Sequence, residues 1–243
     1  MKNFFKNLVL ASVVLSTSFL NAHTLKVGTN ANFPPFEFVD ENSKITGFDI
    51  DLIDAISKKV GFEYEIVNMG FDGLIPALKS GKIDIIASSM SATEERKKAV
   101  DFTDAYYITE NAFIKRKADL SIKTKDDTKG KAFGVQLGTI QEWAVDKIKD
   151  AKKITMKNPI GVVMALKNSK LDVVILDLSV ANGYVRENSD LEIFHIEPDG
   201  SDGSSFALDK DKHTELVTKF NNAIKELKVD GTYDKLLEKY NLK

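Results

Sequence analysis

Short apolar runs recur along the chain and are separated by longer amphipathic stretches. The runs Leu25–Thr29, Phe62–Val67 and Ile83–Ala87 predict strands, and the last is continuously apolar, as expected for a strand covered on both faces. Strands that alternate with helical patterns are typical of α/β layers with mainly parallel sheets.

Helix signals lie between these runs. Apolar positions at helical spacing predict a helix that Asp49 caps and Gly61 ends. A second helix is predicted over Gly73–Ser80, with Pro76 in its first turn, where a missing N–H does no harm.

The pattern then repeats itself. Ala77–Ser88 aligns without gaps to Ala165–Leu176, and about five of the twelve aligned positions are identical. Lys131–Val135 opens the second unit much as Leu25–Thr29 opens the first. Two repeated segments in the same order predict two lobes with the same architecture.

Two stretches are candidates for crossings between the lobes. Ala112–Lys117 is extended and ends in basic residues, and Glu197–Ser205 is rich in turn-forming residues. A strand at Phe206–Leu208 and a long amphipathic helix follow. We expect lobe 1 at 23–112 plus 207–243 and lobe 2 at 113–206, with two crossings that act as a hinge.

The N-terminus has the features of a secretory signal peptide. Lys2 and Lys6 precede the apolar run Leu8–Leu20, and Ala22 is a small residue at the expected cleavage point. The alternative is a buried N-terminal helix. We expect residues 1–22 to be removed and the mature protein to begin at His23.

Composition narrows the function classes. The formal charge of −2 becomes −4 without the two signal-peptide lysines, so neither nucleic acid nor an anionic membrane surface is an expected partner. The chain has no cysteine, which excludes disulfides, thiolate metal sites, cysteine nucleophiles and a lipid-modified cysteine. We expect a periplasmic protein without a lipid anchor.

The first candidate site follows the strand Ile83–Ala87. In parallel α/β sheets, ligands bind beyond the C-terminal ends of the strands. Ser91 and Glu94 have the spacing of a capping box, and Arg96 on the first turns could bind a carboxylate with both of its terminal nitrogens. The alternative is an ordinary capped surface helix with a solvated Arg96.

Two further candidates lie in the second unit. Gly134–Gln141 reads as a strand, a turn and a helix start, where the backbone N–H groups of Thr139 and Ile140 could bind an anion. Asp177 follows the apolar strand Leu171–Leu176, and it could hold an ammonium group or merely cap the next helix. A cation, an anion and two helix starts together fit the zwitterionic end of an α-amino acid, with Phe33 and Phe71 able to cover its apolar stem.

These segments resemble the amino-acid-binding family of periplasmic solute-binding proteins that serve ABC importers. The resemblance covers essentially the whole mature chain and is most specific from Asp72 to Tyr107; further matching segments include Val27–Asn30, Pro34–Phe38, Gly47–Leu52, Gly134–Gln141, Leu171–Asp177 and Asp230–Lys235. It implies a two-lobed type II periplasmic-binding-protein fold, in which a mainly parallel sheet flanked by helices forms each lobe.

The resemblance also implies roles for individual residues. Arg96 would bind the ligand's α-carboxylate together with Ser91 and the backbone at Thr139 and Ile140. Asp177 and Ser89 would bind the α-ammonium group. The remaining positions would surround the ligand: Ser88 as part of the lining, Phe33 and Phe71 beside the side chain, and Asn30 and Gln136 in contact with it.

The resulting hypothesis is a monomeric binding protein that passes an amino acid to a membrane permease, without catalysis, cofactor or metal. Two alternatives stay open: a dehydratase-like enzyme on the same scaffold and a ligand-presenting protein that docks on a chemoreceptor. His195 and His213 fall outside the motifs.

The two amides at Asn30 and Gln136 predict a neutral polar ligand such as glutamine, because a buried cation beside them would lack a counter-charge. Relatives that take basic amino acids often have an acid at the position of Asn30. An acid such as Glu37 or Glu142 turned into the cleft would instead admit arginine.

Overall fold

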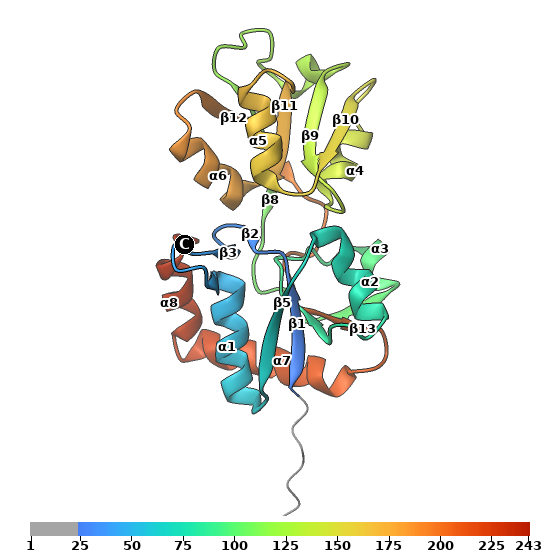
Figure 1. The fold of residues 1–243 in the computed structure, drawn as a ribbon, viewed down its shortest axis with the longest axis vertical. Coiled ribbons are helices and arrows are strands. Elements are labelled where there is room, and N and C mark those ends of the chain that lie inside the picture. The colour runs from blue at the N-terminus through green and yellow to red at the C-terminus, as the bar shows by residue number, and fades with distance from the viewer. Residues whose placement is uncertain (1–23) are drawn as a thin grey trace, which may run out of the picture.

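The computed structural model describes residues 24–243, so the predicted signal peptide and its cleavage site lie outside the described residues. The molecule consists of two lobes stacked along its longest axis and joined by narrow crossings (Figure 1). Within this described part, no helix is long and apolar enough to span a membrane.

The first lobe is built on a five-stranded sheet of order β5-β1-β6-β13-β7. Its strands are β1 (Leu25–Thr29), β5 (Tyr64–Asn68), β6 (Ile85–Ile86), β7 (Val100–Phe102) and β13 (Ala207–Asp209). Strand β1 is parallel to both neighbours, and β13 is antiparallel to both of its own. Only β13, the strand that returns from the other lobe, therefore runs against the rest.

The second lobe repeats this plan with the order β10-β9-β11-β8-β12. Its strands are β8 (Glu110–Arg116), β9 (Ala132–Gln136), β10 (Lys152–Met156), β11 (Val173–Asp177) and β12 (Leu191–Pro198). Here β8 is the single reversed strand. The predicted α/β architecture with mainly parallel sheets is confirmed, and in each lobe the reversed strand is the one that follows a crossing.

Helices cover both faces of each sheet. In the first lobe these are α1 (Phe48–Val60), α2 (Leu74–Lys79), α3 (Glu94–Lys97), α7 (Thr214–Val229) and α8 (Thr232–Lys239), with the short helix η1 (Phe71–Gly73). In the second they are α4 (Gln141–Asp146), α5 (Pro159–Lys167) and α6 (Leu178–Glu187), with η2 (Lys125–Thr128). A small sheet of β2 (Asn32–Phe33), β3 (Glu37–Val39) and β4 (Ile45–Thr46) lies beside α1.

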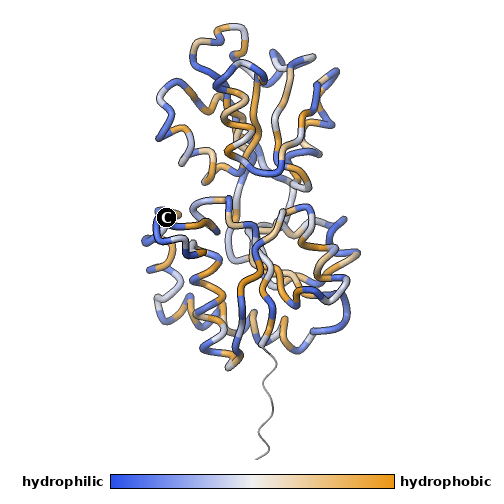
Figure 2. The backbone as a smooth tube through the Cα atoms, in the orientation of Figure 1, coloured by the Kyte–Doolittle hydropathy of each residue, from blue (hydrophilic) through white to orange (hydrophobic). Residues whose placement is uncertain are grey.

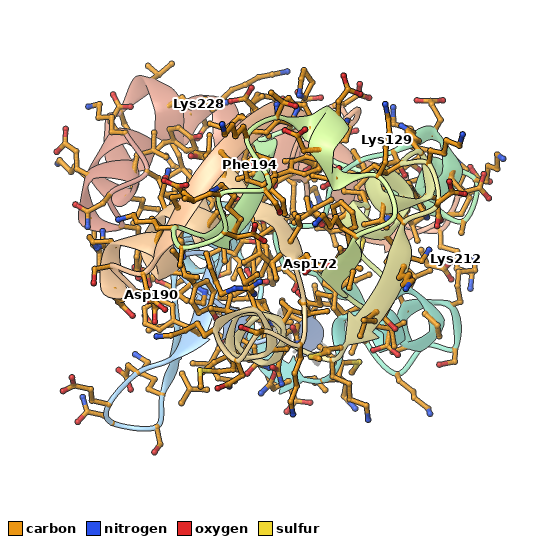
Figure 3. All side chains as sticks on the ribbon, turned by 90° about the horizontal axis from the view of Figure 1, so that it is seen from above. Lys129, Asp172, Asp190, Phe194, Lys212 and Lys228 are labelled. Carbon is orange, nitrogen blue, oxygen red and sulfur yellow. The ribbon has the colours of Figure 1, made fainter. Side chains whose placement is uncertain are left out.

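The core lies on the two faces of each sheet because neighbouring strand residues point in opposite directions. Ile85 packs in the cluster that contains α1 and α7, and Ile86 packs in the cluster that contains α2. Apolar residues accordingly concentrate along the strands and the inner faces of the helices (Figure 2). In the view from above, the exposed Lys129, Asp190 and Lys212 lie around the outside of the molecule (Figure 3).

The internal repeat is visible at one point of close packing in each lobe. A Cβ on Gly28 of β1 would come within 2.3 Å of Ile83, and a Cβ on Gly134 of β9 would come within 2.3 Å of Leu171. Ile83 and Leu171 are aligned positions of the sequence repeat. The same close contact between a strand glycine and an aliphatic side chain occurs in both lobes, which supports their shared architecture.

Three local predictions are wrong. Asp49 does not cap α1 but lies inside its first turn, fully buried. Ser91 does not cap α3, because Thr93 does so by accepting a 3.2 Å hydrogen bond from the Arg96 amide. The segment 112–117 is not a crossing: residues 112–116 belong to β8, since its apolar residues pair with strands on both sides.

The chain crosses just before β8, and it returns after β12. The two crossing segments lie side by side, because Tyr107 on the outward path forms a β-bridge with Ser204 on the return path. Two adjacent crossings of this kind can act as one hinge.

Candidate binding site

A small cavity lies between the lobes at the C-terminal ends of the parallel strands. All eleven predicted site residues line it: Asn30, Phe33, Phe71, Ser88, Ser89, Ser91, Arg96, Gln136, Thr139, Ile140 and Asp177. Two more residues, Glu37 and Gln141, complete the lining. Both lobes contribute, so the cavity depends on how they are held together.

Arg96 is a buried cation fixed by both lobes. Its guanidinium donates to the Ser91 carbonyl at 2.9 Å and, across the cleft, to the Gly138 carbonyl at 3.0 Å. The group also lies 5.4 Å from the Phe71 ring centre and 5.9 Å from that of Trp143. Burial lowers the pKa of Arg96 to about 10, which still leaves it charged at neutral pH. The alternative of a solvated surface arginine is therefore wrong.

The two predicted amides meet across the cleft. The Gln136 side-chain amide donates to the Asn30 side-chain oxygen at 2.9 Å, and the Asn30 amide donates to the Met69 carbonyl at 2.8 Å. Gln136 comes from the end of β9 and Asn30 from the residue after β1. The two lobes thus contact each other directly inside the cavity.

Asp177 at the end of β11 caps α6. Its Oδ1 accepts from the amides of Ser179 at 2.9 Å and Val180 at 3.4 Å. Burial raises the pKa of Asp177 to about 6. No cation among the described residues forms an ion pair with this carboxylate, so the cap and an ammonium ligand are compatible roles.

The start of α4 lies beside the cavity and has no side-chain cap. The Thr139 amide donates to the Gln136 carbonyl at 3.3 Å, and the Thr139 hydroxyl donates to the same oxygen at 2.8 Å. In this arrangement the Thr139 amide thus closes a turn, and the binding of a ligand carboxylate by the backbone at Thr139 and Ile140 stays a prediction.

Glu37 lines the cavity, whereas the prediction of a neutral ligand assumed that no acid lies beside the ligand side chain. It is 1% exposed, and its Oε1 accepts from the Ser88 hydroxyl at 2.7 Å. Its other carboxylate oxygen has no hydrogen-bond partner among the described protein groups. Burial, together with the charge of nearby Asp49, raises the pKa of Glu37 well above its ordinary value.

Two more residues beside the cavity are the acid Glu142, which the sequence analysis considered, and the amide Gln141, which it did not consider. Glu142 does not line the cavity, because its carboxylate accepts from the Gly138 amide and lies 3.9 Å from Lys153. Gln141 was missed; its side chain donates to Asn111 at 2.9 Å, a pairing that no local pattern indicates. Glu37 had a sequence signal, because it is an acid between two phenylalanines at the start of the short strand β3.

The chain is similar to known proteins over nearly all of its described residues. The family model described as bacterial extracellular solute-binding proteins, family 3, matches residues 25–243. A probable histidine-binding protein of Campylobacter jejuni is 51% identical over 219 residues, which is 90% of this chain and 85% of that protein. The arginine-binding extracellular protein ArtP of Bacillus subtilis is 43% identical over 225 residues, covering 89% of this chain and 85% of ArtP.

Solved structures are similar over the same range. An ancestral arginine-binding protein bound to arginine superimposes with a TM-score of 0.85 at 45% identity. The match covers 89% of this chain and 97% of that structure, so it includes both lobes.

Proposed function

Because this chain belongs to the bacterial extracellular solute-binding proteins of family 3, we propose that it binds an amino acid between its lobes and delivers it to the permease of an ABC importer. One cavity contains a buried guanidinium at Arg96 and a buried carboxylate at Asp177. These are the two charges that complement the α-carboxylate and the α-ammonium group of an amino acid.

The ligand class we propose is a cationic amino acid, with arginine as the principal ligand. The observation that carries this proposal is Glu37, a buried acid whose free oxygen and charge have no protein partner among the described residues. A buried carboxylate is costly unless it is paired, and a guanidinium would pair with it. The prediction of a neutral ligand rested on a cleft without such an acid, and that premise is wrong. The names of the relatives support a basic ligand.

Calorimetry with the mature chain tests the ligand class. Arginine, lysine, histidine, glutamine and glutamate are titrated in turn, and arginine should bind most tightly and glutamate least. Glu37→Gln should weaken arginine by tenfold or more and leave glutamine nearly unchanged, because only the cationic side chain loses its partner. Glu65→Gln is the matched control, since Glu65 is an exposed residue of β5 outside the cavity. Stronger binding of glutamine than of arginine by the unmodified chain would contradict this choice.

Binding without chemical conversion is part of the proposal. Glu37 is a buried acid that a dehydratase on this scaffold could use for proton transfer, so the two functions need a direct test. Arginine incubated with the protein should be recovered unchanged by mass spectrometry. A product of altered mass that disappears in Glu37→Gln would favour the enzyme.

We also propose that the protein acts as a monomer in the periplasm after removal of its signal peptide. A hinge that closes on its ligand needs no second subunit. Intact mass of the exported protein should begin near His23, and light scattering should give one chain per particle. Retention of Met1 on exported protein would contradict the predicted processing.

A further inference from the structure

Two consecutive serines at the edge of the cavity hold two buried carboxylates that belong to different elements. The Ser88 hydroxyl donates to Glu37 at 2.7 Å, and the Ser89 amide donates to Asp49 at 2.6 Å. The Asp49 amide in turn donates to the Phe36 carbonyl at 2.9 Å, so the start of α1 lies against β3 (Figure 1). Glu37 and Asp49 are therefore neighbours inside the first lobe.

Both carboxylates are buried without an ion pair and with incomplete hydrogen bonding. Glu37 is 1% exposed and Asp49 is fully buried, and one oxygen of each lacks a hydrogen-bond partner among the described groups. Neither forms an ion pair with any cation of residues 24–243. Two buried anions side by side are strongly unfavourable.

The groups that donate hydrogen bonds to Glu37 and Asp49 are all neutral. Tyr106 donates to Asp49 at 2.5 Å, and the Tyr106 carbonyl accepts from Tyr233. Across the cleft, Asp177 adds negative charge that acts on both acids. Arg96 shares the cavity, but its guanidinium donates to the carbonyls of Ser91 and Gly138. No cation of residues 24–243 thus forms an ion pair with Glu37 or Asp49.

A bound proton would relieve the repulsion. Burial is the largest cause that raises the pKa of each acid, to about 7 for Asp49 and well above the ordinary value for Glu37. Two acids that interact this strongly titrate as a pair.

We infer that the empty cleft keeps one proton on the Glu37–Asp49 pair, and that entry of a cationic side chain displaces this proton into solvent. The exchange balances, because one positive charge enters the site and one leaves it. Glu37 lines the cavity and would pair with the ligand, while Asp49 does not line it and acts as a positioning residue through its charge and its bond to Ser89. The inference rests on the proposed cationic ligand.

The test is calorimetry of arginine binding at pH 7 in phosphate and in Tris, two buffers that differ in ionisation enthalpy. The difference between the two apparent binding enthalpies, divided by the difference between the buffer ionisation enthalpies, gives the number of protons released. Citrulline is the matched ligand, because it replaces the guanidinium with a neutral urea and keeps the α-groups. It therefore reports any protons released by Asp177 alone.

Arginine should release up to one proton more than citrulline. The affinity for arginine should accordingly rise by up to about tenfold per pH unit between pH 6 and 8, relative to that for citrulline. Asp49→Asn keeps an oxygen for Ser89 and Tyr106 and removes the second acid, so the excess release should fall. Asp54→Asn, a matched change at the ion-paired Asp54 on the same helix, should leave the release unchanged.

Each outcome decides between the two proposals. Tight binding of arginine with no excess proton release over citrulline would overturn the proton exchange and leave the proposed ligand class intact. Failure of arginine, lysine and histidine all to bind would overturn the ligand class and this inference together. If Asp49→Asn does not fold, the comparison of arginine with citrulline on the unmodified chain still decides.

Discussion

The side-chain amide of Gln136 donates a 2.9 Å hydrogen bond to the side-chain oxygen of Asn30, which joins the two lobes inside the binding cavity. A second link runs from Arg96 to the Gly138 carbonyl, and a third connects the hydroxyls of Tyr107 and Ser179 at 2.9 Å. The lobes are thus held in contact by polar groups, and ligand contacts can add to or replace these bonds when the hinge closes.

Gly138 should control closure. Its φ is +84°, and a Cβ there would lie 2.9 Å from the Asp72 Cα in the opposite lobe. Gly138→Ala should therefore weaken arginine binding by about tenfold or more, with a larger radius of gyration in small-angle scattering at saturating arginine. Gly130→Ala is the matched control, because Gly130 has a φ of +74° with nothing within 4 Å of the added atom. Both variants carry the same backbone strain, so equal affinities in the two would show that contact with Asp72 is not limiting.

Arg96→Ala should abolish most of the binding. The ligand carboxylate would face a buried site without its cation, a loss of roughly 3–5 kcal/mol in calorimetry. Arg186→Ala removes an exposed arginine from the second lobe and should have no effect on affinity. Near-normal affinity of a folded Arg96→Ala protein would exclude Arg96 as the carboxylate ligand.

Asn30→Asp should increase the preference for cations. The change adds a negative charge to a cavity that already contains Glu37 and Asp177, so the ratio of arginine to glutamine affinity should rise. It also replaces the donor to the Met69 carbonyl with a second acceptor, which should lower the free energy of unfolding by about 1–3 kcal/mol. Competition binding and chemical denaturation measure the two effects separately. An unchanged ratio would mean that this position does not contact the ligand side chain.

Trp143 should report ligand binding. It is the single tryptophan of the chain, is 41% exposed, and its ring lies 5.9 Å from the Arg96 guanidinium. A carboxylate bound at Arg96 should change the electrostatic surroundings of the indole, so arginine should shift or quench its emission, whereas glutamate should not at the same concentration. An emission spectrum that stays constant while calorimetry shows saturation would place closure away from α4.

Without ligand, the protein should become less stable as the pH rises from about 4 to 7. Burial raises the pKa of Asp49 to about 7 and that of Asp177 to about 6, so the folded state binds these protons more tightly than the unfolded state. By contrast, ion pairing and hydrogen bonds lower the pKa values of Asp209 and Asp230 to about 2, so their contribution is lost only below pH 4. The melting temperature measured across this range should fall.

Asp49→Asn should flatten that dependence. The amide cannot ionise, so the cost of deprotonating the buried acid at pH 7–8 disappears, and the free energy of unfolding there should rise by roughly 1–4 kcal/mol. A melting profile as steep as that of the unmodified chain would mean that another group titrates in this range.

The sequence by itself determined the layered α/β architecture, the repeat and the positions that meet at the cleft. These properties depend on local signals: apolar runs such as Ile83–Ala87, a glycine after a helix as at Gly61, and polar residues directly after a strand. Parallel strands end at one edge of a sheet, so Arg96 and Asp177 could be assigned to one site from their place after a strand.

Only the tertiary structure decided which charges remain unpaired inside that site. Glu37 and Asp49 are acids on separate elements, and nothing in their local sequence shows that Ser88 and Ser89 hold them side by side without an ion pair to any described cation. Likewise, the pairing of Asn30 with Gln136 spans 106 residues of sequence. Charge compensation depends on distances and burial in three dimensions, and these follow from the packing of β3, α1 and the two lobes rather than from any local pattern.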